Sequence, residues 1–411
     1  MVYGRDNDAT DAGQLTGRHS LSRSGPASNL DDVFDDPSHG EVGRDRLGVH
    51  FAWEGVLLLG VAVLAYLMFA GYPDAVKGDP LRELLVFAAA LGLLAFGAAM
   101  TLRVGAPNLA LGPMAVASGL YYARNSGDGL IDTAILPVGL GLALGLGIAL
   151  IVVGFHVPGW AGSLVAALAV IAWIQNRFPG AVDVAGTFDP ASEGYYLFGG
   201  FAVLSLVAGL LGIIKPIRRG VGRFRPIGDP AVRRGSVAAT VTALGLTLST
   251  GLAAVAGMIL AAASGAADQP VTPTIGLEWT ALAIGVALVG GISAFGRRGG
   301  VFGTVLGTLL IALLIRYGEV AGWKISIWLI GAGAVGVGLI VTRLVETFGR
   351  PLAIDEDSAD DWSDVGVGSA TGWSTAPASD DPWAGFSTAP TSPPPPTTTS
   401  TTQWGDTDRW R

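Results

Sequence analysis

The sequence contains no cysteine among its 411 residues. Disulfides, thiol catalysis and cysteine-based metal sites are therefore excluded. Histidine is almost as scarce: the chain has four, and no two of them stand at the i, i+4 spacing with which one helix supplies a pair of zinc ligands. These absences argue against a thiol enzyme and against a zinc hydrolase.

Two further absences limit how the chain could obtain energy for active transport. No Gly-x-x-x-x-Gly-Lys-Ser/Thr loop occurs, so the chain has no P-loop with which to hydrolyse ATP. The apolar segments contain almost no ionisable side chains away from their ends, and we expect Glu54, near the start of the first segment, to be solvated at the membrane interface. An ion-coupled carrier needs ionisable groups within the membrane. Energy for any active transport is therefore expected to come from another chain.

Charged residues are also few. They make up 14% of the chain, against about 25% in soluble domains. Hydrophobic residues make up 50%, and the mean hydropathy is +0.52. The 61 glycines would weaken the helices of a soluble protein, but in lipid small residues let helix backbones approach closely. This composition predicts an all-α membrane protein.

Ten segments are candidate membrane helices, because a helix needs about 20 mostly apolar residues to cross the hydrocarbon layer. Several segments are shorter than that and are expected to be tilted, broken or partly re-entrant. The predicted spans are 51–72, 84–102, 109–122, 135–155, 160–174, 196–214, 237–263, 279–295, 302–315 and 325–345.

Basic residues are concentrated in the loops that would share one side of the membrane with the N-terminus. Cytoplasmic loops are enriched in Lys and Arg, so both termini are predicted to be cytoplasmic in a multi-pass protein of the plasma (inner) membrane. The longest of these loops alone contains Lys215, Arg218, Arg219, Arg223, Arg225, Arg233 and Arg234.

The two ends of the chain differ from the apolar middle, the predicted membrane domain 49–350. Residues 1–48 are polar with mixed charge, and 351–411 combine an acidic patch with a run rich in Pro, Ser and Thr. Neither composition can bury a core, so both tails are expected to be disordered. The C-terminal tail repeats Gly-Trp/Phe-Ser-Thr-Ala-Pro at 372–377 and 385–390. Low-complexity drift and a docking tail are both consistent with this repeat.

The segment 105–113 is the first of three that stand out, because two prolines and two glycines surround an asparagine and break the helical pattern. Backbone groups freed at membrane depth must be satisfied by protein or by a water-filled cavity. One interpretation is the lining of a substrate path, with Asn108 as donor and acceptor. The other is a helix-start cap in which Asn108 satisfies its own backbone. The substrate-path candidates are Pro107, Asn108, Leu109 and Gly112.

The loop 223–235 is strongly basic and contains a helix-start signal, because aspartate suits the N-cap and proline the first helical position. Such loops often serve only as positive-inside anchors. The length of this loop and its internal helix signal favour a docking helix for a partner ATPase. The docking candidates are Arg225, Gly228, Asp229, Pro230, Arg233 and Arg234.

The segment 290–307 is dense in glycine, which predicts a tight turn between two closely packed helices. By itself this signal is generic for membrane proteins. The candidate residues of the turn are Gly290, Gly291, Ser293, Phe295, Gly296 and Gly299.

Together the three segments resemble motifs of the permease subunits of ATP-binding-cassette (ABC) importers of the ribose/galactose and branched-chain amino-acid type. The first is similar to that family's Gly-x-x-Asp/Asn-Leu-x-x-Gly turn. The second, at 228–232, is similar to its cytoplasmic Gly-x-Asn-Pro-x-Ala-Ala segment, but is one residue shorter and has Val where the second Ala falls. The third is similar to the sugar branch's Gly-Gly-x-Ser-x-Phe-Gly-Gly-x-Gly motif followed by Gly-Thr-x-x-Gly, with Arg297 replacing one Gly. The resemblance covers about 84–345.

The resemblance implies a permease subunit that passes a small polar solute inward, with carbohydrate favoured. Branched-chain amino acids and nucleosides are alternatives, since Asn108 in place of Asp resembles those branches. The implied partners are ABC ATPase subunits that carry the ATP, an extracytoplasmic solute-binding protein, a second permease copy (homo- or heterodimer) and membrane lipid. The chain itself is expected to be no enzyme and to bind no cofactor, metal or nucleic acid. A non-transporting membrane scaffold, whose tails recruit cytoplasmic partners, is the alternative from another class.

Overall fold

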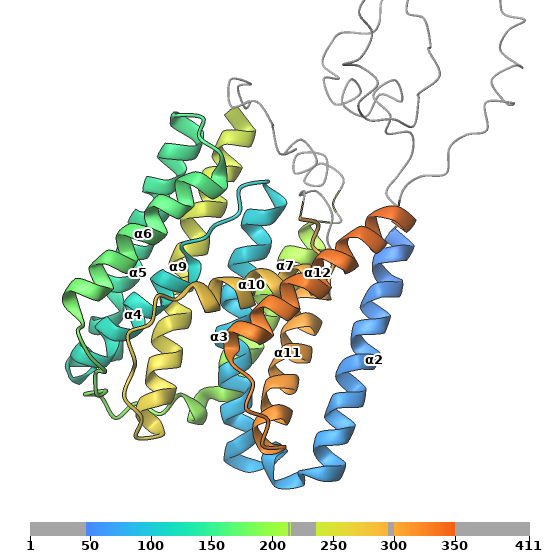
Figure 1. Cartoon of the computed structure of the whole chain (residues 1–411), viewed down its shortest axis with the longest axis horizontal. Coiled ribbons are helices and arrows are strands. Elements are labelled where there is room, and N and C mark those ends of the chain that lie inside the picture. The colour runs from blue at the N-terminus through green and yellow to red at the C-terminus, as the bar shows by residue number, and fades with distance from the viewer. Residues whose placement is uncertain (1–46, 213, 215–235, 295–299, 350–411) are drawn as a thin grey trace, which may run out of the picture. The chain divides into compact units, whose positions relative to one another are not determined.

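The described part of the chain folds into α-helices, as the computed structural model in Figure 1 shows. The predicted all-α membrane protein is thereby confirmed. The described residues are 47–212, 214, 236–294 and 300–349. Their helices are α2 (Leu47–Gly71), α3 (Gly78–Arg103), α4 (Leu111–Asn125), α5 (Leu130–Ala149), α6 (Gly159–Arg177), α7 (Gly194–Leu211), α9 (Ser236–Ala266), α10 (Leu277–Val289), α11 (Gly303–Val320) and α12 (Ile327–Gly349).

Eight of the described helices are long and apolar enough to cross a membrane, which makes the chain a multi-pass membrane protein. One of them, α5, is extended by a π-helical turn, Leu150–Gly154. The other two helices are short: α4 has 15 residues and α10 has 13, against about 20 for a complete crossing. Each predicted span contains one helix, but the number of complete crossings stays a prediction.

Helices α3 and α9 lie at the centre of the bundle and run antiparallel. A Cβ added at Gly97 of α3 would lie 3.2 Å from the carbonyl oxygen of Ser249 in α9, and one at Gly245 would lie 3.9 Å from the carbonyl oxygen of Met100. As residue numbers rise along α3, those of the facing α9 residues therefore fall. Glycine at these positions lets the two backbones approach closely, which is how helices associate in lipid.

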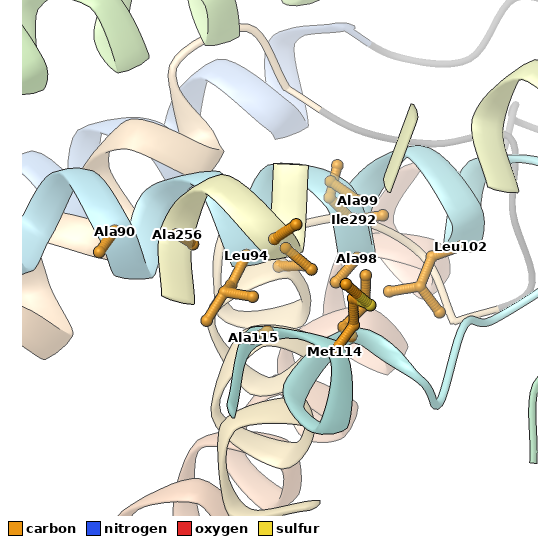
Figure 2. Packing of buried hydrophobic residues seen from close by; sticks show 14 of the residues in the cluster. Ala90, Leu94, Ala98, Ala99, Leu102, Met114, Ala115, Ala256 and Ile292 are labelled. Carbon is orange, nitrogen blue, oxygen red and sulfur yellow. The ribbon is translucent and has the colours of Figure 1, made fainter. Parts of the chain in front are cut away.

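The largest buried apolar cluster joins α3, α4, α9 and α10 around this centre. Most of its members are alanines and leucines, so four helices approach one another with little side-chain bulk between them. Figure 2 shows part of this cluster, with Ala90, Leu94, Ala98, Ala99, Leu102, Met114, Ala115, Ala256 and Ile292 labelled.

The outer helices carry apolar side chains that the other described residues leave largely exposed. Leu59 on α2, Ile131 on α5, Tyr196 on α7 and Leu329 on α12 are examples, each more than half exposed. In water such a surface would be unfavourable, whereas lipid tails solvate it. The exposed apolar residues are therefore consistent with direct contact to lipid.

The connections that follow α6 and α9 are tied together by a β-bridge. The Val182 N–H donates to the Val271 carbonyl at 2.9 Å, and the Val271 N–H donates to the Val182 carbonyl at 2.8 Å. A second contact on the same side joins Val184 to Gly265 near the end of α9. Two connections that are distant in sequence thus form one surface at this end of the bundle.

Candidate functional site

Helix α3 ends in a Schellman motif, after which the chain turns back into the bundle. The Gly105 N–H donates to the Leu102 carbonyl at 2.9 Å, and the Ala106 N–H donates to the Thr101 carbonyl at 3.0 Å. Gly105 has a φ of +64°, which glycine adopts without a Cβ penalty. A non-helical segment then leads to α4.

Helix α9 ends in the same way. The Asp268 N–H donates to the Gly265 carbonyl at 3.0 Å, and the Gln269 N–H donates to the Ser264 carbonyl at 2.9 Å. Asp268 has a φ of +53°, a left-handed conformation that aspartate tolerates better than most side chains. A non-helical segment, 270–276, then leads to α10. The chain therefore contains two units of one kind, each a long helix, a Schellman turn, a non-helical segment and a short helix.

The two units run in opposite directions, because their long helices are antiparallel. Each short helix packs against the long helix of the other unit. The Ser118 hydroxyl of α4 donates to the Ala254 carbonyl of α9 at 2.9 Å, and Leu282 of α10 shares a buried cluster with Leu91 of α3. Inverted units with discontinuous helices are typical of membrane transport proteins, in which they surround the solute site near the bilayer midplane.

The N-termini of the two short helices meet, and we call this contact the α4–α10 junction (Leu109, Gly112, Gly276 and Thr280). A Cβ added at Gly112 would overlap the carbonyl oxygen of Gly276, so the two backbones touch. The Thr280 hydroxyl accepts a hydrogen bond from the Gly112 N–H at 2.9 Å and donates to the Leu109 carbonyl at 3.1 Å. One side chain thus satisfies both an orphan amide of the first turn of α4 and a carbonyl of the broken segment before it.

The side chain of Asn108 stabilises the broken segment, the non-helical stretch between α3 and α4. This side chain is 1% exposed. The Oδ1 atom accepts from the Ala110 N–H at 3.0 Å, and the Nδ2 atom donates to the Ser249 hydroxyl of α9 at 2.9 Å. The bond to Ala110 is a local turn bond that ends before α4 begins, because Ala110 is the N-cap of α4 and has no side-chain cap bond. The bond to α9 joins the two units. A role of Asn108 in lining a substrate path stays a prediction.

The other predicted residues of this segment surround the junction. The Pro107 carbonyl accepts from the Ser163 hydroxyl of α6 at 2.9 Å, and Leu109 and Gly112 belong to the junction itself. Pro107 and Leu109 are half-buried, whereas Gly112 is buried. The first predicted segment is therefore brought together with residues 276–280, which the sequence did not single out.

Glu278 is the residue that sequence reasoning missed. Its side chain is 3% exposed, one residue outside the predicted span that begins at Trp279. The Thr274 hydroxyl donates to Oε1, while Oε2 has no hydrogen-bond partner among the described residues. Two meeting helix N-termini concentrate positive partial charge, and a carboxylate in the first turn of α10 offsets it. An acidic residue two positions after a glycine and directly before an apolar run was the available signal.

Glu54 corrects a second expectation. Its side chain is 5% exposed, so it is buried rather than solvated at the interface. The Oε1 atom accepts from the backbone N–H groups of Phe302 at 2.7 Å and Gly303 at 3.0 Å. The carboxylate thus caps the N-terminus of α11, a contact between helices distant in sequence that hydropathy does not detect. The prediction that the membrane region lacks buried ionisable groups is wrong for Glu54 and Glu278.

The glycine-rich turn begins as a close backbone contact between α10 and α11. A Cβ at Gly303 would overlap the Gly290 carbonyl oxygen, and Gly291, with a φ of +84°, occupies the left-handed position of a third Schellman motif. Ser293 is buried. The remaining predicted residues of the turn and all of the docking candidates lie outside the described residues: Phe295, Gly296, Gly299, Arg225, Gly228, Asp229, Pro230, Arg233 and Arg234.

No cluster of three metal-ligating side chains occurs within the part of the chain that the structure describes. Comparison with protein-family models, with curated proteins and with solved structures found no match to this chain. The features that indicate a function are therefore the geometry of the junction and the motif resemblance.

Proposed function

We propose that the chain is the membrane-spanning permease subunit of an ABC importer that passes a small polar solute inward. The observation that carries this proposal is the inverted pair of broken helices whose N-termini meet at the α4–α10 junction. A scaffold has no need of helices interrupted inside the bundle, whereas a transporter uses them to present backbone groups to a solute. This contrast favours transport over the scaffold alternative.

The chemistry of the junction favours a polar solute, with carbohydrate as the first candidate and branched-chain amino acids or nucleosides as alternatives. The side chains of Asn108, Thr280 and Glu278 place an amide, a hydroxyl and a carboxylate in or next to the two helix starts. Solute hydroxyl groups can donate to and accept from such groups. In this conformation the side chains of Asn108 and Thr280 form hydrogen bonds within the protein. A passing solute would replace these bonds with its own hydrogen bonds to the same side chains.

Energy would come from partner ATPase subunits, because the chain has no P-loop. In this proposal the ATPase binds the ATP and docks on the 225–235 segment, and the chain pairs with a second permease copy. A solute-binding protein docks on the outer connections 178–195 and 264–277, and the bridge between Val182 and Val271 supports their use as one surface. ATP binding shifts the bundle between two states only if docking differs in affinity between them.

Replacing Gly228–Arg234 by a flexible linker of equal length tests the proposal. ATP-driven uptake into vesicles that contain the chain, the ATPase and the binding protein should be lost, while membrane insertion is retained. Normal uptake would refute the docking assignment. If the purified chain alone concentrates a solute against its gradient, the need for a partner ATPase is refuted.

The burial of Glu278 favours a second candidate, an ion-coupled carrier, because such carriers need an ionisable group within the membrane. Uptake by the chain alone should then depend on an imposed proton or sodium gradient. The isosteric variant Glu278→Gln should abolish that dependence. Uptake that follows ATP and ignores both gradients would exclude this candidate.

A further inference from the structure

Two consecutive residues of α2, Trp53 and Glu54, contact the C-terminal end of one helix and the N-terminal end of another. We call these two residues the Trp53–Glu54 clamp. The indole Nε1 of Trp53 donates to the Val289 carbonyl, in the last turn of α10, at 2.8 Å. The Glu54 carboxylate accepts from the Phe302 and Gly303 N–H groups, in the first turn of α11. The indole donor thus meets a carbonyl in the last turn of α10, where carbonyls lack helical partners. The carboxylate meets N–H groups at the start of α11, where N–H groups lack helical partners. Both contacts are favourable at these helix ends.

Glycines make room for the clamp. A Cβ at Gly291 would lie 3.2 Å from Cδ1 of the Trp53 indole, and a Cβ at Gly300 would overlap Oε1 of Glu54. The Arg103 guanidinium at the end of α3 also donates to the Gly300 carbonyl at 3.3 Å. The glycine-rich turn is therefore shaped to receive side chains from α2 and α3, as well as to bring α10 and α11 together.

Helix α10 connects this clamp to the α4–α10 junction. Its 13 residues correspond to a length of about 20 Å, with Val289 near the clamp and Thr280 at the junction. Along its length α10 packs against the backbone of α12, where Gly285 lies against Ala334 and Gly338 against Leu288. A shift of α10 as one body would move its end at the clamp and its end at the junction together.

We propose that Trp53 and Glu54 are positioning residues that hold α10 in the orientation in which the α4–α10 junction is closed. Release of the clamp lets α10 shift and exposes the junction, so that the first helix of the bundle controls access to it. This inference rests on the proposed function only in taking the junction as part of the solute path.

The absence of cysteine from the chain provides a direct test. A reporter is introduced as Leu109→Cys, since Leu109 belongs to the junction and is half-buried. A second reporter, Ser192→Cys, lies on an exposed outer connection. The full chain is reconstituted in phosphatidylethanolamine–phosphatidylglycerol vesicles, and the rate of modification by 2-aminoethyl methanethiosulfonate is measured for each reporter.

The clamp variants are Trp53→Phe, which removes the indole donor, and Glu54→Gln, which removes the charge. Matched controls are Trp160→Phe and Glu83→Gln, whose native side chains are largely exposed. Loss of a clamp hydrogen bond should raise the modification rate at position 109 by about five-fold. The rate at position 192 and the rates in both controls should stay unchanged. Glu54→Asp, which keeps the charge, should restore part of the protection.

Unchanged modification at position 109 in both clamp variants overturns the proposal. An equal rise at positions 109 and 192 also overturns it, because the bundle would then have loosened as a whole. If both variants fail to fold, as judged by size-exclusion chromatography, the two residues are structural supports and the proposal is likewise overturned. Modification needs neither solute nor ATPase, so these outcomes are independent of whether the chain proves to be an importer.

Discussion

Single polar side chains join the two inverted units, and Thr280 does so most directly. Its hydroxyl serves the Gly112 N–H and the Leu109 carbonyl at once. Backbone groups buried inside the bundle cost free energy when they lose their partners, because they are left unpaired. The junction is therefore expected to be sensitive to changes of a few atoms.

Thr280→Val removes this hydroxyl while keeping the shape of the side chain. The free energy of unfolding should fall by about 1–3 kcal/mol, since one donor and one acceptor are left unpaired. Thr308→Val is the control, because the Thr308 hydroxyl only bonds the Thr304 carbonyl within its own helix at 2.7 Å. Unfolding in detergent, followed by circular dichroism, measures both variants. Equal losses in the two would contradict the role given to Thr280.

Gly112→Ala should be far more damaging, because its methyl group would overlap the Gly276 carbonyl oxygen. Separating the two backbones should cost at least about 3 kcal/mol or prevent folding. Gly139→Ala in α5 is the control: nothing lies within 4 Å of its added Cβ, and alanine favours a helix by up to about 1 kcal/mol. The measurement is the thermal midpoint of each purified variant, and a midpoint of Gly112→Ala at or above the native value would contradict the backbone contact.

At the scale of the elements, hydropathy predicts where helices lie but not where each one begins and ends. The predicted span 84–102 is shorter than α3, which starts at Gly78 because a charged turn precedes the apolar run. In that turn Arg82 and Asp79 form an exposed ion pair at 3.2 Å. Polar residues that continue a helix beyond the lipid leave no hydropathy signal, so the outer turn of α3 was not predictable in this way.

The two broken segments differ in how visible they are. The first was predicted because Pro107 and Pro113 occur with two glycines and Asn108 within an apolar region. The second, 270–276, also contains two prolines and a glycine but follows polar residues, so its sequence is that of an ordinary outer loop. What makes it part of the site is its contact with Gly112, and a contact between residues so far apart in sequence has no local signature. Glu278 was missed for a different reason: it stands one residue outside the predicted span, although its place between a glycine and an apolar run was a local signal.

Asp268 occupies a left-handed position where Gly105 stands in the other unit. Asp268→Gly should therefore raise the free energy of unfolding, by up to about 1 kcal/mol, because glycine carries no Cβ strain there. Asp268→Ala keeps the strain and should bring no gain. Chemical unfolding of the two variants in parallel checks the difference. A stabilisation of equal size in both would mean that the charge of Asp268, and not its backbone, is responsible.

At the scale of the whole molecule, contacts between helices that are distant in sequence hold the bundle together. The clamp joins α2 to α10 and α11, the junction joins α4 to α10, and the β-bridge joins the connections after α6 and α9. The general class, a multi-helix membrane protein, followed from composition alone. The internal inversion did not, because it depends on how α3 and α9 face each other.

Val182→Cys combined with Val271→Cys tests the bridge between the outer connections. These residues exchange two backbone hydrogen bonds, and such a pair has a Cα separation of about 5.5 Å, which suits a disulfide. The double variant should oxidise quantitatively and each single variant should keep a free thiol, as thiol titration of the otherwise cysteine-free chain would report. Free thiols in the oxidised double variant would show that the two connections do not meet.

The contact between Gly112 and Thr280 has a consequence for biosynthesis. The two residues are 168 positions apart in the chain, and ribosomes add about 5–20 residues per second. For roughly ten to thirty seconds the first half of the nascent protein is therefore in the bilayer before Thr280 has been synthesised. Its broken segment then lacks the contact that Thr280 later provides. During that interval the exposed amide of Gly112 needs a temporary partner, either water admitted to the insertion site or another protein.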